Sequence, residues 1–406
     1  MNVLHINQSD ISSGAAIAAY RLHEGLLRLG IESNILASSV RTSSHRVAQV
    51  PRNNLGGKML YCLTHPLSLN YIHNIGSFDV ANHGFYQKAD VINFHNLHTG
   101  HFNYLALPTL TKHKPAVFTL HDMWGFTGHC AYSYDCNRWQ TGCGHCLYPE
   151  SYPPVKRDNT RIEWQIKKWI YYHANLTIVT PSYWLMEQAK KSMLNKFLIY
   201  HIPHGIDTNI YQPLDKENCR NLLGIPSQKK VLMFGADYLN DNRKGGDLLK
   251  EALASLPPRL KTEIVLLTIG NCGDSFSETL GMMNVSLDYV SGDRLKAIAY
   301  SAADLFVFPT RADNFPLMLQ ESLSCGTPMV SFDIGGVSDL VRHDVTGYLA
   351  SPENVDDFRY GITQLLGDQT LRHKMSESCR TIALEEYSLE LQSKHYLDLY
   401  KKILNS

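Results

Sequence analysis

Short apolar segments alternate with longer amphipathic segments along almost the whole chain of 406 residues. The apolar segments are rich in Val, Ile, Leu and Phe, which is typical of strands that are buried on both faces. Strands that alternate with helices form parallel sheets with right-handed crossovers, so the sequence predicts an α/β fold. In the first half we predict a helix at residues 14–29 and strands at residues 1–7, 34–37, 91–95, 116–120 and 176–179.

The same alternation starts again after residues 203–207. A chain of this length has room for two to three domains of about 150 residues each. The repeat therefore predicts two Rossmann-like domains, residues 1–203 and 204–386, followed by a terminal amphipathic helix within residues 387–406. In the second half we predict a helix at residues 246–256 and strands at residues 230–234, 263–269, 285–290, 303–309 and 329–332.

The composition is that of an ordinary globular protein, with 44% hydrophobic and 19% charged residues. No apolar run approaches the roughly 20 residues that span a membrane. The first residues, from Met1 to Ile6, lack the basic region and apolar core of a signal peptide. We therefore expect the chain to stay in the cytoplasm.

The two halves of the chain differ in charge, although the net charge is zero. Residues 1–200 hold 18 Lys and Arg against 11 Asp and Glu, a net charge of +7, and the remainder carries −7. A basic first domain would suit an anionic acceptor, such as a lipid diphosphate, or an acidic membrane surface. Surplus charge also simply keeps a protein surface in water, and the sequence leaves both interpretations open.

A predicted strand, a turn and a short helix follow one another between residues 303 and 328. Asn314 is a good N-cap residue and Pro316 suits the first helical turn, while Gly326 fits the left-handed position after a helix. Asp313 precedes this helix, and Glu321 lies roughly 7–8 Å further along its axis. The free N–H groups between the two carboxylates form an anion site, so the segment could hold a sugar, a diphosphate and a ribose in a line. Ordinary surface acids on any βα unit would give the same spacing.

This segment resembles the acidic signature of the family 4 retaining glycosyltransferases, in which two acids eight positions apart flank a nucleotide-sugar. The sequence motif Arg-x-Asp-Asn-Phe-Pro-Leu, with Glu four residues later, is most similar to that of the colanic-acid and other exopolysaccharide transferases. The resemblance implies the GT-B fold, with two Rossmann-like domains that face each other across a cleft. It also implies a C-terminal helix that crosses back to the N-terminal domain. The family usually has Glu at the first acidic position, where this chain has Asp313.

The resemblance also implies roles for individual residues. Asp313 would hold hydroxyls of the donor sugar, and Glu321 would hold the ribose. Gly292 falls where the family passes its backbone around the nucleobase. The positions at which the family places main-chain groups beside the diphosphate are Asn314, Phe315 and Pro316.

Cations are expected beside the diphosphate, because its departure leaves new negative charge that a preorganised cation stabilises. Lys244 matches the lysine that the family places before a glycine. The family's usual arginine is replaced by Ala236, and we interpret Arg243 as the substitute cation. Lys244 is therefore assigned to catalysis as well as to donor binding. A solvated basic loop is the alternative for these residues.

Two further positions come from the N-terminal half. His121 stands at the end of a predicted strand, where ligands of open α/β sheets bind. The family has a His at this place, close to the donor sugar, and the resemblance therefore assigns His121 to catalysis. Gly14 begins the first predicted helix, where the family usually has two adjacent glycines that contact the donor phosphate. The turn lacks the G-x-G-x-x-G of a dinucleotide site, so NAD binding is not expected. A structural histidine and a simple turn glycine are the alternatives.

Four of the nine cysteines cluster within 17 residues of one another, at positions Cys130, Cys136, Cys143 and Cys146. In a cytosolic chain such a cluster indicates metal rather than disulfides, and four thiolates can form a tetrahedral structural zinc site. Ordinary thiols and a redox pair remain alternatives. The loop directly follows His121 and could shape the acceptor side.

The segment 161–172 is basic and aromatic. It is interpreted either as a helix that lies on a membrane surface or as a core helix with snorkelling lysines.

The resemblance covers nearly the whole chain and predicts a retaining, metal-independent glycosyltransferase of bacterial surface polysaccharide biosynthesis. It would take a UDP- or GDP-sugar as donor and a glycan or lipid-linked acceptor, at the cytoplasmic face of the inner membrane. We expect no cofactor in catalysis and no nucleic acid partner. A GT-B nucleotide-sugar 2-epimerase and a non-catalytic nucleotide-sugar-binding subunit are the alternatives.

Overall fold

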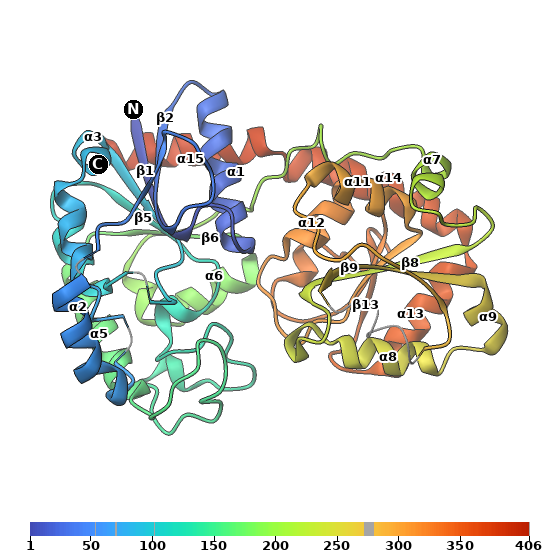
Figure 1. Ribbon diagram of the computed structural model, residues 1–406, viewed down its shortest axis with the longest axis horizontal. Coiled ribbons are helices and arrows are strands. Elements are labelled where there is room, and N and C mark those ends of the chain that lie inside the picture. The colour runs from blue at the N-terminus through green and yellow to red at the C-terminus, as the bar shows by residue number, and fades with distance from the viewer. Residues whose placement is uncertain (53, 70, 101, 272–279, 406) are drawn as a thin grey trace. The chain divides into compact units, whose positions relative to one another are not determined.

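The computed structural model describes residues 1–52, 54–69, 71–100, 102–271 and 280–405. The chain divides into two compact units, Met1–Gly205 together with Leu389–Ser406, and Ile206–Ser388. Each unit contains one parallel sheet with helices on both faces (Figure 1). The predicted α/β class with two Rossmann-like domains is therefore confirmed.

The first unit has a seven-stranded sheet in the order β3-β2-β1-β4-β5-β6-β7, and every strand pair is parallel. All five predicted strands are present. The sequence analysis missed the two edge strands, because each has three residues and is only partly buried. The strands are β1 (Asn2–Ser9), β2 (Glu32–Ser39), β3 (Val47–Gln49), β4 (Val91–Phe94), β5 (Ala116–Thr119), β6 (Thr177–Thr180) and β7 (Ile199–His201).

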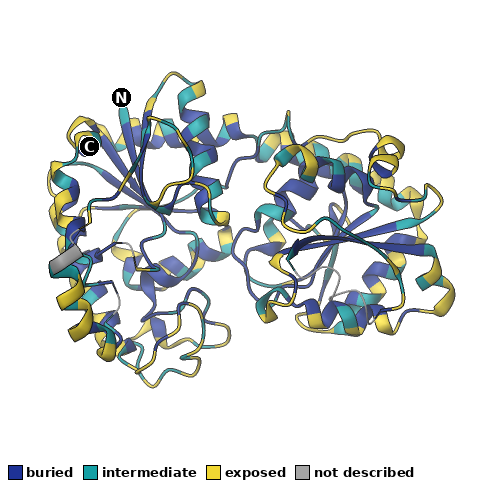
Figure 2. Ribbon diagram, viewed as in Figure 1, coloured by how far each residue is buried: buried dark blue, intermediate teal, exposed yellow. Residues whose placement is uncertain are grey.

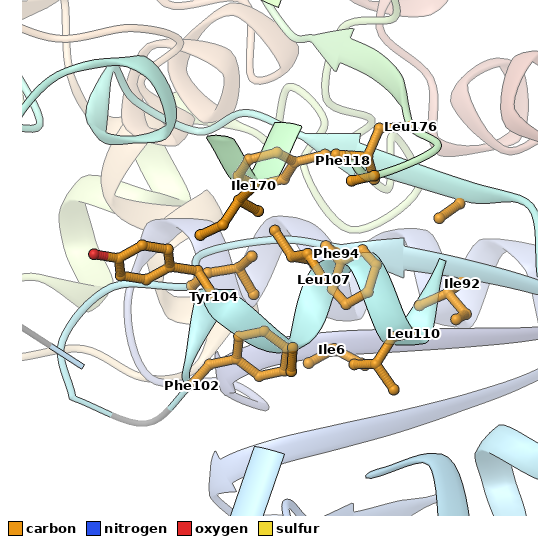
Figure 3. Close-up of a cluster of buried hydrophobic side chains, with 14 of the residues drawn as sticks. Ile6, Ile92, Phe94, Phe102, Tyr104, Leu107, Leu110, Phe118, Ile170 and Leu176 are labelled. Carbon is orange, nitrogen blue, oxygen red and sulfur yellow. The ribbon is translucent and has the colours of Figure 1, made fainter. Parts of the chain in front are cut away.

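Apolar side chains on one face of this sheet form the larger core of the unit (Figure 3). Ile6, Ile92, Phe94 and Phe118 project from the central strands, and Leu107 meets them from a covering helix. The helices of the unit are α1 (Gly14–Arg28), α2 (Asn54–Thr64), α3 (Gly84–Lys88), α4 (Leu107–Leu110), α5 (Thr160–His173), α6 (Tyr183–Lys190) and α15 (Leu389–Leu404).

Helix α5 corresponds to the basic aromatic segment and packs one face into this core. Ile170 and Tyr171 are buried, and Lys167 is almost completely buried. The ammonium of Lys167 donates to the carbonyls of Trp124 at 2.6 Å and Thr127 at 3.0 Å. The core interpretation is thus confirmed for this face, although the lysine is fully inside and does not snorkel. The opposite face leaves Ile162, Trp169 and Tyr172 exposed.

Helix α15 belongs to the first unit and lies against α1 on the other face of the sheet (Figure 1). The phenol of Tyr400 accepts a hydrogen bond from Asn93 at 2.8 Å, and that of Tyr396 lies 3.0 Å from the hydroxyl of Thr119. Both tyrosines are buried among apolar residues of the strands and α1. The expected return of the terminal helix to the N-terminal domain is therefore confirmed.

Replacing Gly205 by Ala should destabilise the first unit. A Cβ at Gly205 would lie 2.7 Å from the Cα of Leu389, where α15 begins, so the helix start must move. Overpacking of this kind costs about 1–3 kcal/mol. All five tryptophans lie in the first unit, so tryptophan fluorescence during urea unfolding measures the loss. Gly84→Ala is the matched control because its Cβ would meet nothing within 4 Å; equal stability of the two variants would contradict this docking.

The second unit has a six-stranded parallel sheet in the order β10-β9-β8-β11-β12-β13. One predicted strand, at residues 285–290, is wrong in its limits, because the strand ends at Ser286. The sequence analysis missed the strand that begins at Gly347. The strands are β8 (Lys230–Tyr238), β9 (Ile264–Asn271), β10 (Met283–Ser286), β11 (Leu305–Phe308), β12 (Met329–Phe332) and β13 (Gly347–Ala350).

Two apolar cores cover the faces of this second sheet. The central strands are buried, and the exposed residues lie mainly on the outer helices and loops (Figure 2). No helix in the described part of the chain is long and apolar enough to span a membrane. The helices are α7 (Lys216–Leu222), α8 (Gly246–Ala254), α9 (Pro258–Glu263), α11 (Asp293–Ala302), α12 (Leu317–Ser324), α13 (Val355–Gly367) and α14 (Gln369–Glu386).

Candidate active site

The order of strands in the second sheet brings two distant loops together. Strands β8 and β11 are neighbours at the point where the order reverses, and ligands of open α/β sheets bind beside the carboxyl ends of such strands. The loop after β8 contains a short 3₁₀ helix at Asn242–Lys244. The connection after β11 contains Asp313 and leads into α12. The topology thus places the predicted cations beside the predicted acid.

Asp313 is the centre of this arrangement. Its Oδ2 lies 2.7 Å from the ammonium of Lys244 and 3.3 Å from the guanidinium of Arg243. Its Oδ1 accepts a hydrogen bond from the N–H of Asn314 at 3.0 Å. Burial alone would raise the pKa of Asp313, but the charges of Lys244 and Arg243 outweigh burial and hold the pKa below its ordinary value. The carboxylate is therefore ionised at neutral pH and holds two cations in one place.

The loop after β8 that contains Arg243 and Lys244, called the cation loop below, is held against the end of β11 by backbone contacts. Gly245 has φ +70°, and a Cβ there would lie 1.8 Å from the carbonyl oxygen of Pro309. The carbonyl of Arg243 accepts from the N–H of Arg311 at 2.8 Å and from the hydroxyl of Thr310 at 3.0 Å. These contacts hold the loop in one position relative to Asp313.

Arg311 ties the same loop to its surroundings. Its guanidinium makes two parallel hydrogen bonds to the carboxylate of Asp247, at 2.7 and 2.6 Å, and a third to Glu353 at 3.0 Å. The sequence analysis quoted Arg311 as part of the signature and missed this function. Neither partner is near it in sequence, and no local pattern links the three.

The loop after β12 packs against the backbone carbonyl of Asp313. Gly335 has φ +58°, and a Cβ there would lie 2.1 Å from the carbonyl oxygen of Asp313. The N–H of Gly336 donates to the same carbonyl at 3.2 Å. The glycines therefore permit a close backbone approach that orients Asp313.

The observed start of α12 differs from the start predicted from the sequence. The helix begins at Leu317, and the residue at the N-cap is Pro316, not Asn314. The backbone of Pro316 is extended, with φ −69° and ψ 123°, and the N–H of Asn314 is bonded to Asp313. The left-handed conformation predicted for Gly326 is confirmed by its φ of +70°.

The other residues of the acid segment are largely buried. Glu321 is 3% exposed, and its Oε2 accepts from the hydroxyl of Tyr300 at 3.4 Å. The ring of Phe315 packs edge-on against Tyr387, with centroids 5.7 Å apart. The side chain of Phe315 thus belongs to the core.

Two predicted donor residues belong to other elements of the fold. Gly292 occupies the N-cap of α11, and Gly14 is the first residue of α1 in the first unit. A Cβ at either position would meet nothing within 4 Å, so packing does not require glycine at these places. Their contact with a donor stays a prediction.

His121 follows β5 in the first unit and is not isolated. Its Nε2 lies 3.0 Å from Nδ1 of His95, whose Nε2 lies 3.0 Å from Nδ1 of His5. Burial lowers the pKa of His121 to about 4, so the ring is neutral at neutral pH. The sequence analysis missed His5 and His95, because they lie on other strands and nothing in their local sequence connects them.

The four clustered cysteines are all free thiols. Cys143 accepts from the N–H of Gly128 at 3.2 Å, and the sulfur of Cys146 lies 3.2 Å from Nε2 of His129. Burial raises the pKa of Cys130 to about 12, which favours the neutral thiol. Within the described residues, no three His, Cys, Asp or Glu side chains converge to hold a metal ion. The zinc site on Cys130, Cys136, Cys143 and Cys146 stays a prediction.

Chemically, the cluster in the second unit suits an anionic ligand that also carries hydroxyl groups. Two cations contact Asp313, which precedes α12 by four residues, and N–H groups at a helix start attract negative charge. Asp313 can accept hydrogen bonds from hydroxyls beside that anion. A preorganised group of this kind stabilises negative charge that develops on a departing phosphate.

Two family models match the chain. Residues 12–210 match the model of Glycosyltransferase Family 4, and residues 215–381 match that of Glycosyl transferases group 1. The colanic acid biosynthesis glycosyl transferase WcaC of Escherichia coli (strain K12) is 26% identical over 355 residues, which cover 82% of this chain and 83% of that protein. The uncharacterized glycosyltransferase MJ1607 of Methanocaldococcus jannaschii is 27% identical over 192 residues, 46% of this chain and 48% of that protein.

Solved structures share the fold over nearly the whole chain. Sucrose-phosphate synthase from Thermosynechococcus elongatus has a TM-score of 0.73 at 16% identity, with both chains fully covered. HepE of Anabaena in complex with UDP-glucose has a TM-score of 0.71 at 16% identity, covering 99% of this chain and 100% of that chain. WaaG, a glycosyltransferase of lipopolysaccharide biosynthesis, has a TM-score of 0.67 at 17% identity, covering 97% and 98%. The chain therefore belongs to the family 4 glycosyltransferases and has the GT-B fold.

Proposed function

We propose that this protein transfers a sugar from a nucleotide-sugar to a glycan or lipid-linked acceptor in bacterial surface polysaccharide biosynthesis, with retention of configuration. The observation that carries the proposal is the cluster of Asp313, Lys244 and Arg243 at the switch point of the second sheet. The relatives agree with this assignment, since WcaC is named for colanic acid biosynthesis and HepE was solved with UDP-glucose.

In the proposed reaction the donor diphosphate lies on Lys244 and Arg243, at the N-terminal side of α12. Asp313 holds hydroxyls of the transferred sugar, and Glu321 holds the ribose. The acceptor hydroxyl attacks the anomeric carbon from the face that the diphosphate leaves, so a new C–O bond forms as the sugar–phosphate bond breaks. The acceptor proton passes to an oxygen of the departing diphosphate. Asp313 and Glu321 position groups in this scheme and do not act as the acid and base of a glycoside hydrolase.

Lys244 and Asp313 have linked roles in this proposal. In the free protein the ammonium of Lys244 is paired with Asp313 at 2.7 Å. A bound diphosphate adds a second anion beside the same ammonium, while the sugar hydroxyls supply donors to Asp313. The pair thus keeps a buried carboxylate compensated until the donor takes over part of its interactions.

The experiment is an incubation of the protein with UDP-, GDP- and ADP-sugars, with and without candidate glycan and lipid-linked acceptors. We expect release of nucleoside diphosphate that depends on the acceptor, and an acceptor whose mass rises by one sugar residue. NMR of the product should show the anomeric configuration of the donor. Donor consumption without an acceptor would favour an epimerase, and tight binding without turnover would favour a binding subunit.

A further inference from the structure

A hollow lined by basic side chains lies at the amino ends of strands in the second sheet. It has a volume of about 430 Å³ and is bounded by the starts of β8, β11 and β12, by α7 and by the first turns of α14. The donor cluster, in contrast, follows the carboxyl ends of β8 and β11. The hollow is therefore separate from the candidate active site, although both belong to the second unit. Its charged lining residues are Lys216, Arg220, Lys229, Lys230, Asp304 and Arg372.

The hollow has an excess of positive charge. Asp304 accepts a hydrogen bond from Arg220 at 2.7 Å and lies 3.1 Å from the ammonium of Lys216. Burial alone would raise the pKa of Asp304, but these two cations hold it below its ordinary value. Lys230 pairs with Glu263, which lies outside the lining, at 3.1 Å. The five lining cations and the two carboxylates that contact them thus leave a net charge of +3.

Two of these cations are held by carbonyl oxygens. The ammonium of Lys229 donates to the carbonyl of Thr262 at 2.5 Å. Nη1 of Arg372 donates to the carbonyls of Leu365 and Leu366, at 2.6 and 2.9 Å. Among the described residues, neither cation forms an ion pair with a carboxylate. Because a carbonyl group carries no net charge, it orients a cation without cancelling its charge, and the positive charge of the hollow is preorganised.

The overall charge of the chain does not explain this collection of cations. Residues 201–406 carry a net charge of −7, so the second half of the chain as a whole repels anions. A concave surface lined by one sign of charge concentrates the electrostatic field and attracts counter-ions. Like charges that are held together also repel one another, and an anion that binds between them offsets that repulsion. The hollow therefore suits an anion with several charges.

The uncharged lining narrows the class of ligand. It consists of Gly326, Pro328, Gln369, His373 and Ser376, so none of the described lining residues is Phe, Tyr, Trp or a branched aliphatic residue. A nucleobase would find no apolar side chain to cover it. Phosphate oxygens, in contrast, accept strong hydrogen bonds from guanidinium and ammonium groups. A compact ligand rich in phosphate matches this lining better than a nucleotide does.

We propose that this hollow binds a compact ligand with two or more phosphate groups, through Lys229, Arg372 and the cations around Asp304. The phosphates belong either to a small soluble compound or to lipid headgroups, since both present the same oxygens to these cations. The site goes beyond the proposed transfer reaction and does not depend on it.

The test begins with hydrogen–deuterium exchange of the full chain in the presence of inorganic tripolyphosphate. We expect slower exchange in peptides that cover residues 216–230 and 369–376. Exchange of residues 242–246 reports separately on any binding to the donor cluster. UDP, whose base finds no apolar cover in the hollow, should leave residues 369–376 unprotected. Calorimetric titration with tripolyphosphate is carried out in the Lys244→Met background, which weakens binding at the donor cluster.

Arg372→Gln and Lys374→Gln form a matched pair of variants in that background. Each removes one positive charge from α14, and only Arg372 lines the hollow. Arg372→Gln should weaken tripolyphosphate binding about tenfold to hundredfold, as expected for the loss of a charged hydrogen bond, and Lys374→Gln should leave it nearly unchanged. Lys229→Gln is the second variant, and it replaces Arg372→Gln if circular dichroism shows that the latter is unfolded.

Co-sedimentation with vesicles of phosphatidylglycerol and phosphatidylcholine in equal parts distinguishes the two sources of phosphate. Vesicle binding that is lost in Arg372→Gln, without binding of tripolyphosphate, would assign the hollow to lipid headgroups and support the site. Absence of both kinds of binding, or equal losses in Arg372→Gln and Lys374→Gln, would overturn the proposal. None of these measurements needs turnover, so failure of the proposed transferase reaction would be seen separately.

Discussion

Replacing Lys244 by Met should lower kcat/KM for sugar transfer about a hundredfold to a thousandfold. Lys244 lies 2.7 Å from Asp313 and is proposed to meet the donor diphosphate, so the variant loses a preorganised cation where negative charge develops. Binding of free nucleoside diphosphate should weaken as well, since the cation also contacts the product. Steady-state kinetics and calorimetric titration with UDP or GDP measure the two effects.

Lys374→Met is the matched control for this variant. Lys374 is an exposed lysine on α14 of the same unit, and its loss should leave both quantities unchanged. Lys244→Met also leaves buried Asp313 with Arg243 as its cationic partner at 3.3 Å, so circular dichroism must show that the variant is folded. Unchanged kinetics in a folded Lys244→Met variant would remove Lys244 from the site.

Replacing Gly245 by Ala should destabilise the second unit by about 3 kcal/mol and impair transfer at the same time. An alanine at φ +70° costs about 1–2 kcal/mol, and overpacking of the Cβ against the Pro309 carbonyl, 1.8 Å away, adds about 1–3 kcal/mol. The carbonyl contact can be relieved if the loop with Arg243 and Lys244 moves away from Asp313. Misplacement of about 1 Å can lower a reaction rate about a hundredfold.

Gly224→Ala separates the cost of placing alanine in a left-handed backbone from the cost of overpacking. Gly224 is also left-handed, with φ +66°, but its Cβ would meet nothing within 4 Å. We expect this control to lose about 1–2 kcal/mol and to keep full activity. Urea unfolding followed by circular dichroism gives the stabilities of the two variants, and the transfer assay gives their activities. If Gly224→Ala and Gly245→Ala were equally stable and equally active, the close approach of Gly245 to the Pro309 carbonyl would contribute to neither stability nor activity.

The sequence predicted the parts of the fold that depend on local pattern. The buried central strands appear as apolar runs, and Gly326 marks the end of α12 through its left-handed backbone. The start of the same helix was predicted two residues early. A local rule favoured Asn314 as the cap, whereas the Asp313 carboxylate takes the N–H of Asn314 and Pro316 stays extended.

The sequence predicted those site residues that belong to a recognisable motif. Asp313 and Lys244 came from the family resemblance, and the strand order then explains why they meet. The contact between Arg311 and Asp247 joins residues 64 positions apart, and the contact between His5 and His95 joins residues 90 positions apart. Such contacts follow from the order and register of the strands, which an isolated sequence does not specify.

Hydrogen–deuterium exchange of the full chain with and without a saturating nucleoside diphosphate tests the central claim most directly. A diphosphate bound at the switch point of the second sheet should slow exchange in peptides that cover residues 242–246 and 313–321. The matched peptide of α14 around Lys374 should not change. Protection of these two segments that disappears in Lys244→Met is the result predicted here. Binding that leaves both segments unprotected would contradict the placement of the donor site.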